Sequence, residues 1–342
     1  MTQLQHRLVL EVLEGCAASA RAEAARLGPV GTVSATELEL TTQRLDEVRE
    51  LRRVVAAYST VTVPARRPRE LLETSVLQQV QAIVEDLARQ RPRQRFTGLR
   101  LAAAGADSVD MRRIADAVAE MAGVPVDEDG DLLLRVRRPG GREGTQWQLL
   151  LRTTPRPLSA RAWRTVNYPG AVNATIAATV MDLLEVGADD AVLDLTCGSG
   201  TFLVEQLHTQ APARAVGVDV DPSAIDAARE HQRAARRKGR IDWVVGDVLT
   251  LPLEGGFTRL VTNPPWGTLH GEHRTNEQLH ADLLARAAQL SAPGARLGVL
   301  THEIRRMHQV LDAQPTGEGW RLEREHRFFQ KGHHPRLFLL RR

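Results

Sequence analysis

The stretch VLDLTCGSGTF, residues 192–202, decides how the second half of the chain folds. It starts as a short apolar run, typical of a buried strand, and continues into a turn that contains Gly198 and Gly200. Glycine allows a positive φ or a close approach of the backbone to a ligand, and a helix after the turn offers free amides. The stretch therefore predicts a strand, a ligand-binding turn and a helix. A tight turn without a ligand is the alternative, because a glycine pair alone is weak evidence.

Further apolar runs follow this unit, and stretches that can form helices separate them. The runs are RAVGVDV (214–220), IDWVVGD (241–247), FTRLVTN (257–263) and ARLGVLT (295–301). This alternation is typical of βα units on a parallel sheet. The last stretch, WRLEREHRFFQKGHHPRLFLLRR (320–342), holds two apolar runs with no helix between them, so an antiparallel hairpin should close one edge of the sheet.

The first half of the chain has a different pattern, which predicts an α+β module. Apolar spacing predicts strands at 6–15, 96–105 and 131–138 and helices at 16–28, 69–90 and 110–123. The stretch TTPRPLSARAWRTVNYPG (153–170) is rich in Pro, Arg and Ser and has no period, which predicts a linker. The chain therefore divides into an α+β region at 1–152, a linker at 153–170 and a second domain at 171–342.

Composition argues against several classes of protein. The 342 residues contain no apolar run of the ~18–20 residues that cross a bilayer and no signal peptide, so the predicted location is cytoplasmic. The two cysteines, Cys16 and Cys197, lie far apart and lack metal-type spacing. Neither a disulfide framework nor a metal site is therefore expected.

The net charge of +3 is unevenly distributed. Residues 51–100 hold 10 Arg against 4 acidic residues, mostly in PARRPRE and ARQRPRQRF. Guanidinium groups bind phosphate oxygens in a forked geometry, so this excess is compatible with a polyanion. A solvated helix face explains it equally well, because Lys238 and Lys331 are the only lysines and Arg is the default cation of this chain.

Acidic residues end the next two predicted strands. Asp219 is placed to accept hydrogen bonds from ribose hydroxyls, and Asp247 could meet an adenine amino group. A dinucleotide fits less well, because Phe202 and Leu203 follow Thr201 where a third glycine is expected, and the turn lacks the lysine of a phosphate loop. A ligand with ribose and adenine but no phosphate fits better, and S-adenosylmethionine is such a ligand.

A second motif, TNPPWGT (262–268), follows the fourth apolar run. Pro264 and Pro265 cannot continue a helix or a central strand, since each lacks an amide donor and has a fixed φ. Asn263 before them and Trp266 after them therefore hold a polar carbonyl and an aromatic plane at a set separation. This arrangement favours a flat substrate group.

In this order and spacing, the motifs DLTCGSGTF, GVDVDPSAI, GDV and NPPWG resemble the amino-group methyltransferases with a Rossmann-like fold. With the α+β first half, the segment YPGAVNATIAATV (168–180) and the closing hairpin, the whole chain is similar to the THUMP-domain RNA methyltransferases that modify guanine N2. The nearest type acts on the tRNA acceptor stem. The resemblance implies an α/β fold with a seven-stranded, mostly parallel sheet and an antiparallel closing hairpin, preceded by a ferredoxin-like and THUMP-like region. It also implies S-adenosylmethionine as cofactor, tRNA or another structured RNA as partner, no membrane, no metal and a monomer.

The resemblance assigns roles to individual residues of this sequence. It assigns Asp219 to the ribose of the cofactor and Asp247 to the adenine. The residues that it assigns to the methionine side of the cofactor are Asp194, Cys197, Gly198, Gly200 and Thr201. It assigns the target base to Asn263, Pro264, Pro265 and Trp266, with Asn263 also next to the cofactor. Leu195 stands where relatives usually have proline, which could loosen the turn, and Trp266 replaces a smaller aromatic ring.

The NPPW motif suggests how a weak nucleophile could react. An exocyclic purine amine shares its lone pair with the ring and must be held about 3–3.5 Å from the methyl carbon. The Asn263 side-chain oxygen and the Pro264 carbonyl can accept both N–H groups, while Trp266 stacks on a base that has left its helix. Cys197 is expected to pack in the turn rather than to act as a nucleophile.

The main hypothesis is methylation of a guanine N2 amine in structured RNA, first of all tRNA. The alternatives are an rRNA guanine-N2 methyltransferase, a protein glutamine methyltransferase with the same motif, and a non-catalytic RNA-binding protein with a relic fold. The basic α+β half argues against the glutamine enzyme, and intact Asp219 and Asn263 argue against a relic. The remaining candidates for chemistry are histidines, which we expect to be solvated or to contact RNA: His302, His308, His333 and His334.

Overall fold

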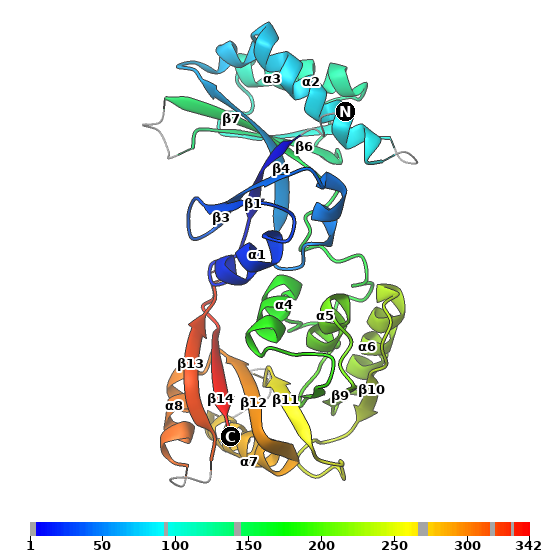
Figure 1. The fold of residues 1–342 in the computed structure, drawn as a ribbon, viewed down its shortest axis with the longest axis vertical. Coiled ribbons are helices and arrows are strands. Elements are labelled where there is room, and N and C mark those ends of the chain that lie inside the picture. Colours follow the sequence, from blue (N-terminus) through cyan, green and yellow to red (C-terminus); the bar gives the residue numbers. More distant parts are fainter. Residues whose placement is uncertain (1–4, 92–94, 140–144, 266–272, 315–318, 330–331) are drawn as a thin grey trace. The chain divides into compact units, whose positions relative to one another are not determined.

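The structure is a computed structural model of the 342-residue chain and describes residues 5–91, 95–139, 145–265, 273–314, 319–329 and 332–342 (Figure 1). The chain forms two compact units. The N-terminal unit comprises Met1–Val12 and Ala20–Leu158, and the C-terminal unit comprises Leu13–Ser19 and Ser159–Arg342. Within the described residues, no helix is both long and apolar enough to span a membrane, and the cytoplasmic location stays a prediction.

A seven-stranded mixed sheet, in the order β2-β3-β1-β4-β7-β6-β5, forms the N-terminal unit. Its strands are β1 (His6–Glu11), β2 (Val30–Thr32), β3 (Glu37–Thr42), β4 (Ala56–Pro64), β5 (Leu99–Ala103), β6 (Leu132–Arg137) and β7 (Gln146–Arg152). The β5–β6 pair is parallel and the other neighbouring pairs are antiparallel. The helical elements are α1 (Ala17–Ala24), α2 (Thr74–Arg89), α3 (Val109–Ala122) and the short 3-10 helices η1 (Leu45–Glu50) and η2 (Pro68–Leu72).

Helices α2 and α3 lie side by side on this sheet because each has one apolar stripe (Figure 1). The α2 stripe includes Val76, Val80 and Val84, which are buried at the helical spacing of four residues. The helix predicted over 69–90 is interrupted, since Glu73 has a ψ of 141° and separates η2 from α2. The predicted α+β character is confirmed, although β2, β3, β4 and β7 were not predicted.

The C-terminal unit is built on a second seven-stranded sheet, in the order β10-β9-β8-β11-β12-β14-β13. Its strands are β8 (Ala191–Asp194), β9 (Arg214–Asp219), β10 (Asp242–Val245), β11 (Phe257–Thr262), β12 (Ser291–Thr301), β13 (Arg321–Arg327) and β14 (Arg336–Arg341). The first five strands in this order, from β10 through β9, β8 and β11 to β12, pair in parallel, and β14 and β13 continue the sheet in antiparallel pairing. This confirms the predicted mostly parallel sheet with an antiparallel closing hairpin.

Helices cover both faces of the second sheet, as expected for a mostly parallel sheet whose central strands are apolar. Helices α4 (Ala174–Leu183), α5 (Thr201–Thr209) and α6 (Pro222–Ala235) lie on one face, and α7 (His273–Leu290) and α8 (Ile304–Asp312) lie on the other (Figure 1). The first layer buries a cluster around Ile176, Phe202 and Phe328, and the second buries one around Phe257, Leu284 and Phe338.

The division of the chain differs from the sequence-based one. Residues 159–170, predicted as part of a linker, belong to the C-terminal unit, where Arg161 forms a buried ion pair with Glu205. The segment Leu13–Ser19, predicted within the first domain, also belongs there. Cys16 is fully buried in the same cluster as Trp163 and Phe328. Burial of apolar side chains therefore places Leu13–Ser19 in the C-terminal unit, although its position in the sequence suggests the first domain.

Candidate functional site

The turns that carry the predicted site residues come together at one edge of the second sheet. Strands β8 to β11 are parallel neighbours, so their carboxyl ends share this edge. Asp194 ends β8, Asp219 ends β9 and Thr262 ends β11. The register pairs Asp194 with Val261, one residue before Thr262. The glycine turn and the NPPW motif therefore begin on adjacent strands.

Backbone hydrogen bonds fix the glycine turn between β8 and α5. Gly198 and Gly200 have φ angles of 50° and 78°, a region that other residues rarely adopt. The Cys197 amide donates to the Val218 carbonyl at 2.8 Å, and the Gly198 amide donates to Oδ2 of Asp219 at 2.8 Å. The turn is therefore held against the end of β9.

Gly200 is constrained by packing as well as by its backbone. A Cβ atom at this position would lie 2.5 Å from Cη2 of Trp243, so a larger side chain would have to displace that ring. Thr201 follows as the first residue of α5 and accepts a hydrogen bond at Oγ1 from Arg164 at 3.0 Å. The turn thus has a fixed shape before any ligand binds.

Asp194 is a fully buried carboxylic acid at the base of the turn. Neither of its carboxyl oxygens forms a hydrogen bond of ordinary geometry with any described residue. Burial raises the pKa of Asp194 well above its usual value, and the neighbouring Asp219 adds to this, while the nearby Thr196 amide acts in the opposite direction. An unpartnered buried carboxyl group is costly and calls for a donor or a cation.

The carboxylates of Asp219 and Asp247 both accept hydrogen bonds from backbone amides of the protein. Oδ2 of Asp219 accepts the Gly198 bond, and its Oδ1 accepts from the Asp221 amide at 3.0 Å. Asp247 is exposed, and its Oδ1 accepts from the Leu249 amide at 3.0 Å. These bonds orient both carboxylates and leave lone pairs on each for further donors.

Two large apolar side chains beside these acids remain open to solvent. Val220, directly after Asp219, is 66% exposed, and Val245, paired with Asp219 in the sheet register, is 43% exposed. Both lie at the carboxyl edge of the sheet. They offer an apolar contact next to a carboxylate, which suits a ligand with a flat ring and hydroxyl groups.

The first residues of the NPPW motif directly follow β11. Asn263 is half-buried, Pro264 is buried and Pro265 is exposed. Oγ1 of Thr262 lies 2.8 Å from Oγ1 of Thr196, which ties the end of β11 to the glycine turn. Trp266 lies outside the described residues, so its stacking role stays a prediction.

Comparison with known proteins places the chain in a family. Residues 161–335, just over half of the chain, match the RMKL-like methyltransferase domain, UPF0020. The chain belongs to this family. It is therefore a methyltransferase, as predicted.

Relatives of this UPF0020 methyltransferase carry more specific names. A protein of Thermus thermophilus named tRNA (guanine(6)-N2)-methyltransferase is 29% identical over 239 residues, which cover 67% of this chain and 66% of that protein. A Methanocaldococcus jannaschii protein of the same name is 23% identical over 184 residues, covering 43% and 48%. The matches span less than two thirds of the length of either relative. The crystal structure of TrmN from Thermus thermophilus matches with a TM-score of 0.76 at 22% identity, covering 99% of this chain and 100% of that one, which shows the fold.

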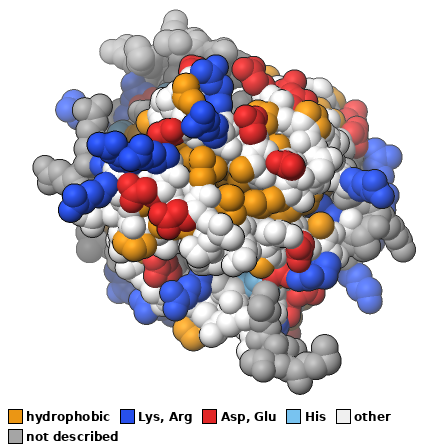
Figure 2. Space-filling model, turned by 90° about the horizontal axis from the view of Figure 1, so that it is seen from above, with side chains coloured by type: hydrophobic (Ala, Val, Ile, Leu, Met, Phe, Trp, Pro, Cys, Tyr) orange, Lys and Arg blue, Asp and Glu red, His pale blue; other side chains and the backbone are white. Residues whose placement is uncertain are grey.

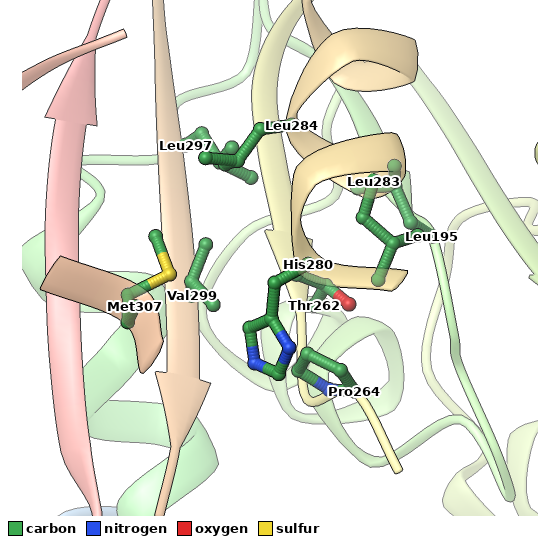
Figure 3. A pocket seen from close by; sticks show the side chains of 9 residues that line it. All are labelled: Leu195, Thr262, Pro264, His280, Leu283, Leu284, Leu297, Val299 and Met307. Carbon is green, nitrogen blue, oxygen red and sulfur yellow. The ribbon is translucent and has the colours of Figure 1, made fainter. Parts of the chain in front are cut away.

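A small, mostly apolar pocket of the UPF0020 methyltransferase lies beside Pro264 (Figure 3). His280 of α7 points toward Pro264 across this pocket. The imidazole is 2% exposed, and its Nε2 lies 3.4 Å from Oγ1 of Thr301. Sequence analysis did not single out His280, because one histidine in an amphipathic helix carries no signal of its own.

Among the predicted histidines, the structure brings His302 and His333 together. Their rings contact edge to face with centroids 5.7 Å apart, and burial, with His333 as a further cause, lowers the pKa of His302. His308 instead faces Glu325 at 3.0 Å. The described residues contain no group of three or more His, Cys, Asp or Glu that could hold a metal ion.

Cys197 is a buried thiol rather than a reactive one. Burial raises its pKa well above the usual value, and Asp194 and Asp219 add to the effect. The thiol therefore stays protonated at neutral pH, which does not suit a nucleophile.

Proposed function

We propose that this methyltransferase transfers the methyl group of S-adenosylmethionine to the exocyclic N2 amine of a guanine in structured RNA, with tRNA as the first candidate. The observation that carries the proposal is that Asn263 and Pro264 follow β11 beside the glycine turn that follows β8. Adjacent strands lie about 5 Å apart, so groups bound at these two turns are close neighbours. Methyl transfer between two bound groups requires such an arrangement.

The residues around the glycine turn fit S-adenosylmethionine. The buried, unpartnered Asp194 would be satisfied by a ligand ammonium group such as that of a methionine moiety. Asp219 retains lone pairs for ribose hydroxyls, and the exposed Val220 and Val245 offer an apolar contact to adenine. When bound, the cofactor supplies an electrophilic methyl group on a positively charged sulfur.

Asn263 and Pro264 would prepare the amine for transfer. The Asn263 side-chain oxygen and the Pro264 carbonyl can each accept one N–H of the amine, which increases its electron density and aims its lone pair. Pro264 is buried over the pocket that His280 lines, so the position of its carbonyl is fixed by packing. No general base is needed before transfer, because the nitrogen proton becomes acidic once the methyl group is attached.

Two observations support RNA as the partner. The relatives described above are named for guanine N2 of tRNA. On the N-terminal unit, Arg66, Arg67 and Arg69 are exposed and form no ion pair with any described residue, which suits phosphate binding. Figure 2 shows Lys and Arg side chains on several sides of the surface that it presents, with Asp and Glu side chains between them. In contrast, Arg91 is engaged with Asp131 at 2.9 Å, so the basic run at 89–95 is partly structural.

The alternatives are less well supported. A protein glutamine methyltransferase could use the same Asn-Pro-Pro arrangement, but such an enzyme is expected to carry a helical bundle where this chain has a seven-stranded sheet. The choice between tRNA and rRNA, a THUMP-like role of the N-terminal unit and a monomeric state stay predictions.

The test is methyl transfer to three separate acceptor pools. The full chain is incubated with methyl-labelled S-adenosylmethionine and with tRNA, rRNA or total protein from cells that lack the enzyme. The proposal expects label in RNA, chiefly tRNA, and a rate of labelling ~10²–10³ times lower with an Asn263→Ala variant. Label in the protein pool alone would favour the glutamine enzyme and overturn the proposal.

A further inference from the structure

Residues 161–168, here called the strap, lie along the glycine turn instead of linking two domains. The strap is anchored at its start by Arg161, whose Nε donates to Oε1 of Glu205 at 2.9 Å. Trp163 donates to the same oxygen through Nε1 at 3.1 Å. All three side chains are buried, so this end of the strap is fixed to α5.

The middle of the strap contacts two residues of the glycine turn region. Arg164 donates through Nη2 to Oγ1 of Thr201 at 3.0 Å. The fully buried His231 connects the strap to Ser199, with Nδ1 3.0 Å from the Ser199 carbonyl and Nε2 3.1 Å from the Val166 amide. Nε2 also lies 3.1 Å from the Val166 carbonyl, so both ring nitrogens of His231 contact main-chain groups, one in the turn and one in the strap.

The strap ends at Tyr168, whose ring stands over the turn. A Cβ atom on Gly198 would lie 3.7 Å from Cε1 of the ring, which is ordinary contact distance. The hydroxyl donates to Oδ2 of Asp221 at 3.0 Å. The ring is therefore held next to Gly198, whose amide donates to Asp219.

The bond from Tyr168 is not needed to complete the cap of α6. Asp221 already caps this helix by accepting from the Ser223 amide at 2.8 Å and from the Ser223 hydroxyl at 2.7 Å. Burial raises the pKa of Tyr168 to about 12, so its hydroxyl remains a donor at neutral pH. What the bond adds is a fixed orientation of a half-exposed aromatic ring.

We propose that Tyr168 contacts the bound cofactor and that the strap forms the wall of the cofactor site on the side of Gly198. The inference rests on the proposed use of S-adenosylmethionine. A fixed, half-exposed ring beside a glycine and a ribose-binding carboxylate offers its face to the ligand at little entropic cost. Arg164 of the strap and His231 of α6 then act as positioning residues, since each contacts the turn or the start of the helix that follows it.

The chain offers a direct test, because Tyr58 and Tyr168 are its only tyrosines. Full-length protein is labelled with carbon-13 at the tyrosine ring ε positions, and a Tyr58→Phe variant assigns the two signals. On titration with S-adenosylhomocysteine, the Tyr168 signal should shift in proportion to the binding measured by calorimetry. The Tyr58 signal should stay in place, since Tyr58 is buried in the N-terminal unit and donates to Glu11.

Substitutions separate the ring from its hydroxyl. Tyr168→Phe keeps the ring and should change the dissociation constant of S-adenosylhomocysteine less than about 3-fold, whereas Tyr168→Ala should weaken binding by about 10-fold or more. Tyr58→Phe is the matched control and should leave affinity unchanged. Saturation of the site with an unmoved Tyr168 signal would overturn the inference while leaving the proposed function intact. A wild-type protein that binds neither S-adenosylmethionine nor S-adenosylhomocysteine would overturn both.

Discussion

Glu205→Ala should strongly destabilise the C-terminal unit, because it removes the counter-charge of a buried cation. The side chains of Arg161 and Glu205 are 1% and 0% exposed, and their closest atoms lie 2.9 Å apart. Removing one partner of a fully buried ion pair costs ~3–5 kcal/mol, since the other charge is left without compensation. For a domain of this size, each kcal/mol lowers the melting temperature by ~2–4 °C. The transition of this unit should therefore move down by roughly 6–20 °C.

Differential scanning calorimetry of the full chain measures this effect, since the two units can unfold in separate transitions. The matched control is Asp226→Ala, which breaks the Arg229–Asp226 pair at 3.1 Å, whose side chains are 50% and 74% exposed. An exposed pair of this kind contributes ~0–1 kcal/mol. Glu205→Gln should fall between the two, because it keeps an acceptor for Arg161 and Trp163 but loses the charge. Equal melting temperatures for Glu205→Ala and Asp226→Ala would refute the view that this pair fastens the strap.

Three further perturbations test the site and the RNA surface. Asn263→Ala should lower kcat by ~10²–10³ and leave cofactor affinity near wild type, because the Asn263 oxygen acts on the amine mainly in the transition state. Single-turnover kinetics measure the first effect and calorimetry the second. An unchanged kcat would mean that the motif is only a rigid turn. The raised pKa of Asp194 means that the ligand-free protein loses stability as the pH rises above the unfolded value of 3.8. Asp194→Asn should therefore flatten the pH dependence of the melting temperature and weaken cofactor binding, and an unaltered pH profile would contradict the assignment. Replacing Arg66, Arg67 and Arg69 by Gln should weaken RNA binding and reduce the slope of log affinity against log salt by about 0.7–0.9 for each phosphate group that these arginines neutralise, so an unchanged slope would exclude this surface.

The sequence predicted the second sheet well because its signals are local. Short apolar runs separated by helical stretches specify parallel strands, and the glycine turn marks the carboxyl edge where Asp194, Asp219 and Asn263 gather. The lack of any helix between β13 and β14 was enough to place the antiparallel hairpin.

The remaining features depend on contacts between residues far apart in sequence. The strap looked like a linker because it lies within 153–170, a stretch rich in Pro, Arg and Ser that has no period. Yet Arg161, Trp163 and Tyr168 are fixed by partners 42 to 53 residues away. Cys16 likewise is buried in the same apolar cluster as Phe328, which no periodicity indicates. In the N-terminal unit, the edge strand β2 has only three residues, too few to produce an alternating pattern.

Nucleoside analysis of a methylated tRNA tests the proposed guanine N2 specificity directly, because it identifies the nucleoside that received the methyl group. The wild-type chain is incubated with S-adenosylmethionine carrying a deuterated methyl group and with tRNA from cells that lack the enzyme, and the digested nucleosides are separated by mass spectrometry. We expect deuterium in N2-methylguanosine, formed ~10²–10³ times more slowly with Asn263→Ala. Deuterium in a methylated adenosine, or in no nucleoside although calorimetry shows that the cofactor binds, would contradict the proposed function.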